Sequence, residues 1–384
     1  MKLLSCAESA RIDREGLLRF ALNQDALIEQ AGLRLWEAFL RARRRTSPPG
    51  GGGRLVFLAG PGNNGRDAQV MARLARAAGG FQPAVIFSAP AARGAAEPWL
   101  RAWGVPGLLP EEEPEEVRAL LGGADYIIDG LCGTGLTGPL RAPEARLVAQ
   151  ANASPAVRLA LDLPSGARDD FCPGDPVFQG RWTLTIALPK TCLYLPALRP
   201  AAGRIILVPL AFPPALLEDP GLPGRRLDWS EARTLIPGIP PEAHKYRRGH
   251  CAVFAGLPRQ GGALGAGILA ARGAAAGPAG LVSLYLPDDQ PGGGFEAAAA
   301  GISAGAPELL VKPESAGFPL PPTVKSLVAG PGWGGAGEGR AAQLRALFDS
   351  GLPGVLDADG LRVFAGAPEL HPPRDRWVFT PHSG

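Results

Sequence analysis

The chain has 384 residues, enough for two or more domains, and 46% of them are hydrophobic, which suffices for ordinary buried cores. A formal charge of +3 is small for this length, and there is no basic stripe interleaved with aromatic residues, so nucleic-acid binding is not expected. Five scattered cysteines lack metal-ligand spacing and are typical of reduced thiols in a cytoplasmic protein, and neither a secretory signal nor a membrane span is expected.

Residues 25–42 predict an amphipathic helix. An apolar stripe that includes Leu27, Ile28 and Leu35 recurs at helical spacing opposite charged positions. Packing explains such a stripe better than ligand binding does, so we expect the helix to serve the core.

The stretch at 54–77 predicts a buried strand, a glycine turn and a helix. An apolar run at 55–59 ends at Gly60, and apolar residues recur at helical spacing over 67–77. Such a turn aims free backbone N–H groups at one spot, which suits a phosphate. Asn63 and Asn64 add side-chain amides there. Because the stretch is neither a Walker loop nor G-x-G-x-x-G, generic motifs leave the ligand open.

Further strands are predicted at 83–87, 126–129, 159–162 and 184–188, and their alternation with helices implies an α/β fold with a parallel, doubly wound sheet. Ligands of such sheets bind outside the carboxyl ends of the strands. One acid at a strand end is more often a turn residue, but several converging ends with two glycine loops favour a site. The side chains at these ends are Asn63, Asn64, Asp129, Asp162, Ser165 and Lys190.

These side chains differ in the chemistry that they suit. The oxygen groups of Asn64, Asp129 and Ser165 suit a hard cation such as K⁺ or Mg²⁺. The glycine loops at 60–65 and 133–138 suit the phosphates of a nucleotide. Asp162, beside a cation and a desolvated ligand, could take or give a proton, and Lys190 could pair with it or be a surface lysine.

Four separated segments, GPGNNGRDAQVMARLA, IIDGLCGTGLTGPLR, LALDLPSG and ALPK, resemble the N-terminal domain of NAD(P)H-hydrate epimerases over residues 1–215. The resemblance implies a Rossmann-like domain that interconverts the R and S epimers of NAD(P)HX, the hydrated and damaged form of NAD(P)H. It implies Asp162 and Lys190 as catalytic residues and Asn64, Asp129 and Ser165 as the K⁺ site. The implied substrate loops contain Asn63, Asn64, Gly65, Arg66, Asp67, Gly133, Thr134, Gly135, Leu136, Thr137, Gly138 and Pro139.

The first loop departs from the family, which usually reads NNGGDG where this chain reads NNGRDA. Arg66 and Ala68 replace glycines and could crowd the loop if the backbone needs a positive φ, or Arg66 could add a phosphate contact. We expect retained activity. The alternative is a non-catalytic nucleotide-binding or interaction protein on an epimerase-like fold.

The second half follows a proline-rich connection at 212–241 and again alternates predicted strands with helices, including a helix at 264–276. Its segments HKxxxG, GPGWG, LDADGL and TPH resemble the C-terminal domain of NAD(P)HX dehydratases, which implies a ribokinase-like fold. That domain, with Mg²⁺ and ADP or ATP, phosphorylates the hydroxyl of the S epimer and then loses phosphate to restore NAD(P)H. Gly332, Asp359 and His382 would lie on the substrate side, although a structural role in a capped turn would account for the presence of His382 equally well.

The family continues after TPH with a glutamate, further α/β units and a G-x-G-D motif, whereas the present sequence ends at Gly384. We therefore expect a partial dehydratase domain that is inactive as given, and a fragment or truncated gene. The predicted domains are 1–222 and 223–384. A small-molecule dinucleotide is the expected partner, a homo-oligomer is allowed, and a ribokinase-like small-molecule kinase is a third reading.

Overall fold

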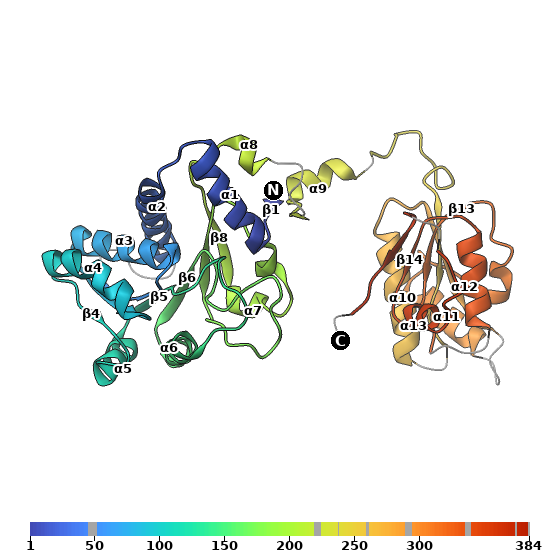
Figure 1. Ribbon diagram of the computed structural model, residues 1–384. Coiled ribbons are helices and arrows are strands. Elements are labelled where there is room, and N and C mark those ends of the chain that lie inside the picture. Colours follow the sequence, from blue (N-terminus) through green and yellow to red (C-terminus); the bar gives the residue numbers. More distant parts are fainter. Residues whose placement is uncertain are drawn as a thin grey trace. The chain divides into compact units, whose positions relative to one another are not determined.

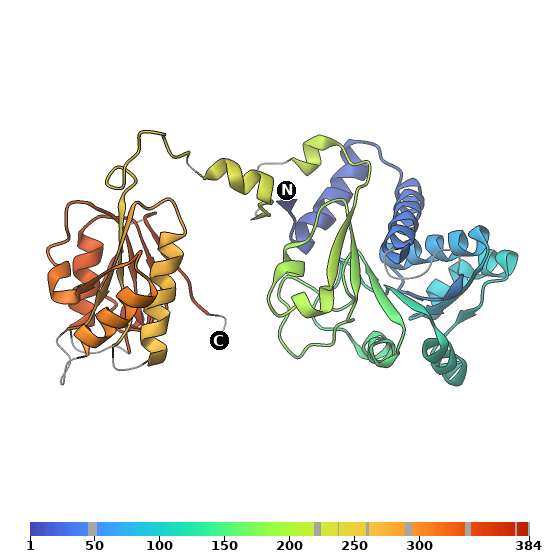
Figure 2. The same ribbon diagram turned by 180° about the vertical axis from the view of Figure 1, so that it is seen from behind.

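The computed structural model describes residues 1–44, 52–218, 224–236, 238–258, 261–288, 294–334, 339–372 and 375–382. The chain forms two compact units, Met1–Arg233 and Thr234–Gly384, each a sheet covered by helices (Figures 1 and 2). The predicted boundary between residues 222 and 223 lies outside the described residues. No helix in the described part of the chain is long and apolar enough to cross a membrane.

The first unit is built on a seven-stranded, fully parallel sheet in the order β4-β3-β2-β5-β6-β7-β8. These strands are β2 (Gly53–Ala59), β3 (Phe81–Phe87), β4 (Gly107–Leu108), β5 (Tyr126–Gly130), β6 (Val157–Leu161), β7 (Trp182–Ile186) and β8 (Arg204–Val208). A short antiparallel pair joins β1 (Lys2–Leu3) to β9 (Gly224–Arg225).

Helices connect these strands. They are α1 (Cys6–Arg19), α2 (Gln24–Arg44), α3 (Asn63–Ala78), α4 (Pro90–Trp103), α5 (Pro114–Gly123), α6 (Ala142–Ala153), the 3-10 turn η1 (Thr191–Tyr194), α7 (Arg199–Ala202), α8 (Pro214–Leu217) and α9 (Trp229–Leu235). The expected helix at 25–42 is confirmed within α2, and most of its stripe is buried, whereas Leu27 is half-buried and lines the cavity described below.

Period-two alternation along the strands builds a core on each face of the first sheet. On β2, Leu55 and Phe57 join the core beneath α2, α3 and α4. Val56 and Leu58 point to the opposite face and join the core beneath α5 and α6. The predicted parallel, doubly wound sheet is therefore confirmed.

The predicted start of the helix after β2 is wrong. The sequence predicts a loop over 60–65 and a helix over 67–77, but α3 begins at Asn63 with Gly62 as its extended N-cap, at φ −88° and ψ −173°. The N–H of Arg66 already donates to the carbonyl of Gly62 at 3.2 Å. The asparagines therefore lie in the first helical turn, where the free N–H groups and the positive end of the helix dipole also lie.

The order of strands creates a crevice. The chain moves from β2 to β3 on one side and later returns to β5 on the other, so the connections after β2 and β5 diverge. Open α/β sheets bind ligands at such a topological switch point.

The second unit has a six-stranded parallel sheet in the order β12-β11-β10-β13-β14-β15. The strands are β10 (His250–Phe254), β11 (Leu281–Leu286), β12 (Leu310–Pro313), β13 (Val324–Ala329), β14 (Gly354–Leu356) and β15 (Trp377–Phe379). The helices are α10 (Gly261–Ala275), α11 (Phe295–Gly305), α12 (Arg340–Asp349) and α13 (Asp359–Ala365), with the 3-10 turn η2 (Glu314–Gly317). Helices α10 and α12 cover opposite faces of this sheet (Figure 1).

Candidate functional site

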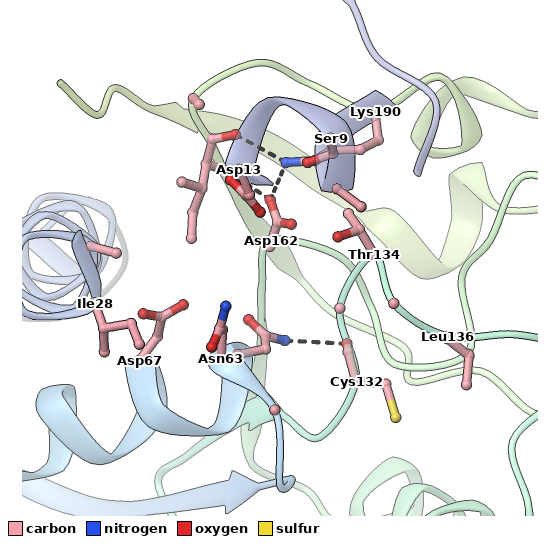
Figure 3. A pocket seen from close by; sticks show the side chains of 18 of the residues that line it. Ser9, Asp13, Ile28, Asn63, Asp67, Cys132, Thr134, Leu136, Asp162 and Lys190 are labelled. Carbon is pink, nitrogen blue, oxygen red and sulfur yellow. Dashed lines mark hydrogen bonds and ion pairs between the residues drawn. The ribbon is translucent and has the colours of Figure 1, made fainter. Parts of the chain in front are cut away.

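A cavity of about 710 Å³ lies at the carboxyl ends of the strands of the first unit. Its walls come from the first turn of α3, the loop after β5, the ends of β6 and β7, and the cavity-facing sides of α1 and α2. Figure 3 shows Asp13, Asp162 and Lys190 together on one wall, with Asp67 and Asn63 across the cavity. The volume falls in the range of small-molecule sites.

Asp162 and Lys190 form a buried ion pair at the ends of β6 and β7. The Nζ of Lys190, a residue only 1% exposed, donates to Asp162 Oδ1 and to the carbonyl of Ile186, the latter at 2.9 Å. The N–H of Ile186 also donates to Asp162 Oδ1 at 2.9 Å. Asp162 has a φ of +59°, a backbone conformation that Asp tolerates better than most residues and that occurs often at functional sites. Both predicted catalytic residues are thus brought together.

Asp129, Ser165 and Asn64 are a second set of buried side chains, of which Asn64 lines the cavity. The carbonyl of Cys132 links them, because it accepts hydrogen bonds from both Ser165 Oγ, at 3.3 Å, and Asn64 Nδ2. Ser165 donates its hydroxyl to Asp129 Oδ1 at 2.6 Å and its backbone N–H to Asp129 Oδ2 at 2.7 Å. Asn64 donates Nδ2 to the carbonyls of Leu161 at 3.0 Å and Cys132 at 3.2 Å. These two acceptors fix the orientation of the amide.

This group fits a hard cation. Once the Asn64 amide is oriented, its buried Oδ1 has no hydrogen-bond partner among the described residues. Burial raises the pKa of Asp129 to about 6, although hydrogen bonds from Ser165 and Leu131 oppose the shift. A buried oxygen with a free lone pair, linked through the Cys132 carbonyl to a serine that holds a desolvated carboxyl, offers the oxygen donors that a hard cation takes.

Asp67 and Asn63 lie across the cavity from the ion pair. Asp67 is buried, and its Oδ1 has no partner among the described residues. Its pKa is raised well above the usual range, first by burial and then by the charges of Asp162 and Asp13, while Arg66 lowers it. The side chain of Asn63 accepts a hydrogen bond from Gln24 of α2 at 3.0 Å.

The two glycine loops differ in how completely they face the cavity. From the second loop, Gly133, Thr134, Gly135, Leu136, Thr137 and Pro139 line the cavity, whereas Gly138, at φ +77°, does not. From the first loop, Asn63, Asn64 and Asp67 line it, whereas Gly65 and Arg66 do not.

Gly65 has a packing role. A Cβ at this position would lie 1.9 Å from the carbonyl oxygen of Gly60, so only glycine lets α3 approach the end of β2 this closely.

Neither lost family glycine crowds the loop. Arg66 is helical and turns outward to pair with the exposed Asp25 of α2. Ala68 is fully buried in the core beneath α2 and α3, where its methyl group packs against the chain at Gly130. Neither residue has a positive φ. Arg66 and Ala68 therefore do not crowd the first glycine loop.

Helices α1 and α2 contribute residues to the cavity that were not predicted as site residues. Ser9, Asp13 and Leu17 of α1 line the cavity, as do Gln24 and Ile28 of α2. Burial and the charge of Asp162 raise the pKa of Asp13 to about 6, although Lys190 opposes the shift. No motif marks these residues. The polar positions beside the apolar stripe of α2 were the only local feature of the sequence that could have indicated a contribution to the site.

In the second unit, the three predicted residues follow neighbouring strands. Gly332 follows β13 at φ +66°, Asp359 begins α13 after β14, and His382 follows β15 and is exposed. Asp359 Oδ2 accepts the N–H of Gly334 at 2.9 Å, which joins the β13 loop to the β14 loop. A Cβ on Gly332 would lie 2.2 Å from the carbonyl oxygen of Ala263.

Comparisons with known proteins match both units. Residues 24–192 match the family described as YjeF-related protein N-terminus, and residues 258–384 match the family described as NAD(P)H-hydrate dehydratase.

Three proteins named bifunctional NAD(P)H-hydrate repair enzyme Nnr are similar over most of the chain. The one from Coxiella burnetii is 32% identical over 86% of this chain and 65% of its own length. Those from Gloeobacter violaceus and Mycobacterium tuberculosis are 33% and 30% identical over 94% and 96% of this chain and 70% and 71% of their own lengths. The chain thus spans about two thirds of the length of these relatives.

A solved structure, yeast YNL200c, aligns with 50% of this chain and 83% of its own, at a TM-score of 0.44 and 24% identity. This likeness is too distant to add to the family matches. The two family matches in order, together with the relatives that span both, show that the chain belongs to the family of bifunctional NAD(P)H-hydrate repair enzymes.

Proposed function

We propose that the first unit interconverts the R and S epimers of NAD(P)HX. The observation that carries this proposal is the Asp162–Lys190 pair, which faces a strand-end cavity that Asn64 also lines. The family match over 24–192 covers all of these residues.

The proposed chemistry is acid–base catalysis of inversion at the carbon that carries the hydroxyl of the hydrate. Inverting that carbon requires one of its bonds to break and form again on the other face, with one proton given and one taken. Lys190 keeps the carboxyl group of Asp162 in place through Oδ1. Asp162 can therefore accept a proton or stabilise positive charge on the substrate.

We propose that Asn64, Asp129 and Ser165 hold K⁺. When bound, K⁺ would supply positive charge beside the substrate phosphates and balance the buried Asp129 carboxylate. The support is the unpartnered Oδ1 of Asn64, whose amide shares the carbonyl of Cys132 with the serine that donates to Asp129. Replacing Asn64 with Ala should raise the K⁺ concentration that gives half-maximal activity at least tenfold.

The phosphates of the dinucleotide are proposed to lie between the first turn of α3 and the 133–139 loop. Free N–H groups at a helix N-terminus favour anions, and the amides of Asn63 and Asn64 face the same cavity. We further propose that the enzyme acts in the cytoplasm, which agrees with the free thiols of all five cysteines.

For the second unit we propose a part in the dehydration of the S epimer, a reaction that uses Mg²⁺ and ADP or ATP, with Gly332, Asp359 and His382 on the substrate side. The dehydratase match over 258–384 and the adjacent positions of these residues at the ends of β13, β14 and β15 support this assignment.

The test is an epimerisation assay on the whole chain, with the R and S forms separated by chromatography. We expect interconversion of purified R-NADHX in K⁺ buffer, much less in Li⁺ buffer, and none above the uncatalysed rate for Asp162→Asn. Binding of NADHX without interconversion would support the alternative, a non-catalytic nucleotide-binding protein. Phosphorylation of a sugar by the chain would support the small-molecule kinase reading.

A further inference from the structure

Helix α1 brings an additional carboxyl group into the cavity. Asp13 lies one turn after Ser9, and both residues line the cavity wall that contains Asp162 and Lys190 (Figure 3). The match to the YjeF-related family begins only at residue 24, so it does not cover α1.

The position of α1 relative to Lys190 is fixed by hydrogen bonds. The N–H of Leu4 donates to the carbonyl of Pro189 at 3.0 Å, and the N–H of Thr191 donates to the carbonyl of Leu4 at 2.7 Å. These bonds lie on either side of Lys190.

The start of α1 is fixed as well. Ser5 and Glu8 form a reciprocal capping box, and the N–H of Cys6 donates to Asp169 at 2.7 Å. Asp13 is therefore carried on a helix that follows directly on the Leu4 contact with the chain around Lys190 and whose first residue is bonded to Asp169.

Asp13 differs from Asp162 in what surrounds its carboxyl group. Asp162 is held by Lys190 and by the N–H of Ile186. Among the described residues, no hydrogen bond or ion pair holds Asp13, which is open to the cavity while the protein around it partly desolvates its carboxyl group. Its pKa of about 6 places both protonation states within reach near neutral pH.

The titratable groups that face Asp13 come from several elements. Asp162 and Lys190 follow β6 and β7, and Asp67 lies on α3. Cys132, Arg141 and Glu144 line the cavity around the β5 loop and the start of α6. On α1 itself, Glu15 pairs with Arg11 and Arg19. Asp162 is the acid that acts most strongly on Asp13.

We propose that Asp13 is the proton donor of the epimerisation and that Asp162 is its acceptor. This inference rests on the proposed function. Asp13 gives its proton to the substrate hydroxyl, the C–O bond breaks with its electron pair on oxygen, and water leaves. Water then adds to the other face of the same carbon and loses a proton to Asp162. Transfer of that proton from Asp162 to Asp13 restores the starting state, so the cycle needs no further reactant.

The sign of the pH dependence follows from this role. A donor must be protonated, so kcat/KM should be highest below a pH of about 6, the pKa of Asp13, and should fall about tenfold per pH unit well above it. Substrate that displaces water from Asp13 raises its pKa further, and the decline in kcat should therefore begin at higher pH than the decline in kcat/KM.

The experiment compares Asp13→Asn, Asp13→Glu and the control Glu15→Gln in the full chain, with epimerisation and NADHX binding measured from pH 5 to 9. We expect Asp13→Asn to lower kcat by about 10²- to 10⁴-fold, with KM within about threefold and no decline above pH 6. Asp13→Glu should keep the decline, and Glu15→Gln should stay within about twofold of the unaltered chain.

Three outcomes would overturn the inference. The first is an Asp13→Asn chain that retains activity within threefold or retains the pH decline. The second is a folded Asp13→Glu chain with a flat pH profile. If Asp162→Asn abolishes activity while Asp13→Asn does not, only this inference fails. The third is an unaltered chain that shows no interconversion, which overturns the proposed function with it.

Discussion

Replacing Lys190 with Met tests the buried ion pair of the first unit. The change removes the charge and both hydrogen bonds from Nζ but keeps a side chain of similar length. Breaking a buried pair by removing one partner costs about 3–5 kcal/mol. Because the side chain of Asp162 is 13% exposed to the cavity, we expect a loss near the lower end, about 3 kcal/mol.

The assay is hydrogen–deuterium exchange with mass spectrometry, because it resolves the two units. A loss of about 3 kcal/mol makes opening of the first unit on the order of 100-fold more frequent, which should appear in peptides from β6 and β7. Peptides from β10 and β13 serve as an internal control. The matched variant Lys325→Met, at an exposed lysine of the second unit, should leave the first unit unchanged.

The double variant Lys190→Met with Asp162→Asn distinguishes the contribution of the ion pair to stability from that of side-chain packing. Removing both charges leaves no uncompensated carboxylate, so we expect recovery of about 1–2 kcal/mol relative to Lys190→Met. Epimerisation should be lost in Lys190→Met and in the double variant. Equal exchange in Lys190→Met and the unaltered chain would refute the reasoning, since it would mean that the pair contributes nothing to the folded state.

Three further predictions use single substitutions in or near α3. The raised pKa of Asp67 means that the folded state binds more protons than the unfolded state, so the stability of the first unit falls as pH rises. Asp67→Asn should therefore stabilise the first unit more at pH 8 than at pH 5, by about 1–2 kcal/mol in thermal unfolding. Its activity should drop. Gly65→Ala, whose Cβ would lie 1.9 Å from the carbonyl oxygen of Gly60, should destabilise by about 1–3 kcal/mol, whereas Gly94→Ala in the open interior of α4 should stabilise by up to about 1 kcal/mol in the same scan. Arg66→Ala removes only an exposed ion pair and should change kcat/KM by less than about twofold; a loss above tenfold would show that Arg66 contacts the substrate.

The convergence of Asp129, Asp162, Ser165 and Lys190 was predictable because it needs only two rules. Apolar runs that alternate with helices give a parallel sheet, and parallel strands place their carboxyl ends along one edge. The structure confirms that edge and joins Asp162 to Lys190 and Asp129 to Ser165.

The position of Asp13 was not predictable in this way. Helix α1 is placed by backbone hydrogen bonds between Leu4 and the chain around Lys190, more than 180 residues away, and no local pattern encodes such a contact. The start of α3 was missed because the asparagines at 63 and 64 are as common in turns as at helix starts, and the extended Gly62 decides between them.

The central claim is that the first unit epimerises NAD(P)HX through Asp162. The most direct measurement is the interconversion of pure R-NADHX by the whole chain in K⁺ buffer, with Asp162→Asn measured in parallel. We predict equilibration of the two epimers well above the uncatalysed rate, and only the uncatalysed rate for the variant. Equal rates for the two chains, with NADHX bound by both, would contradict the claim.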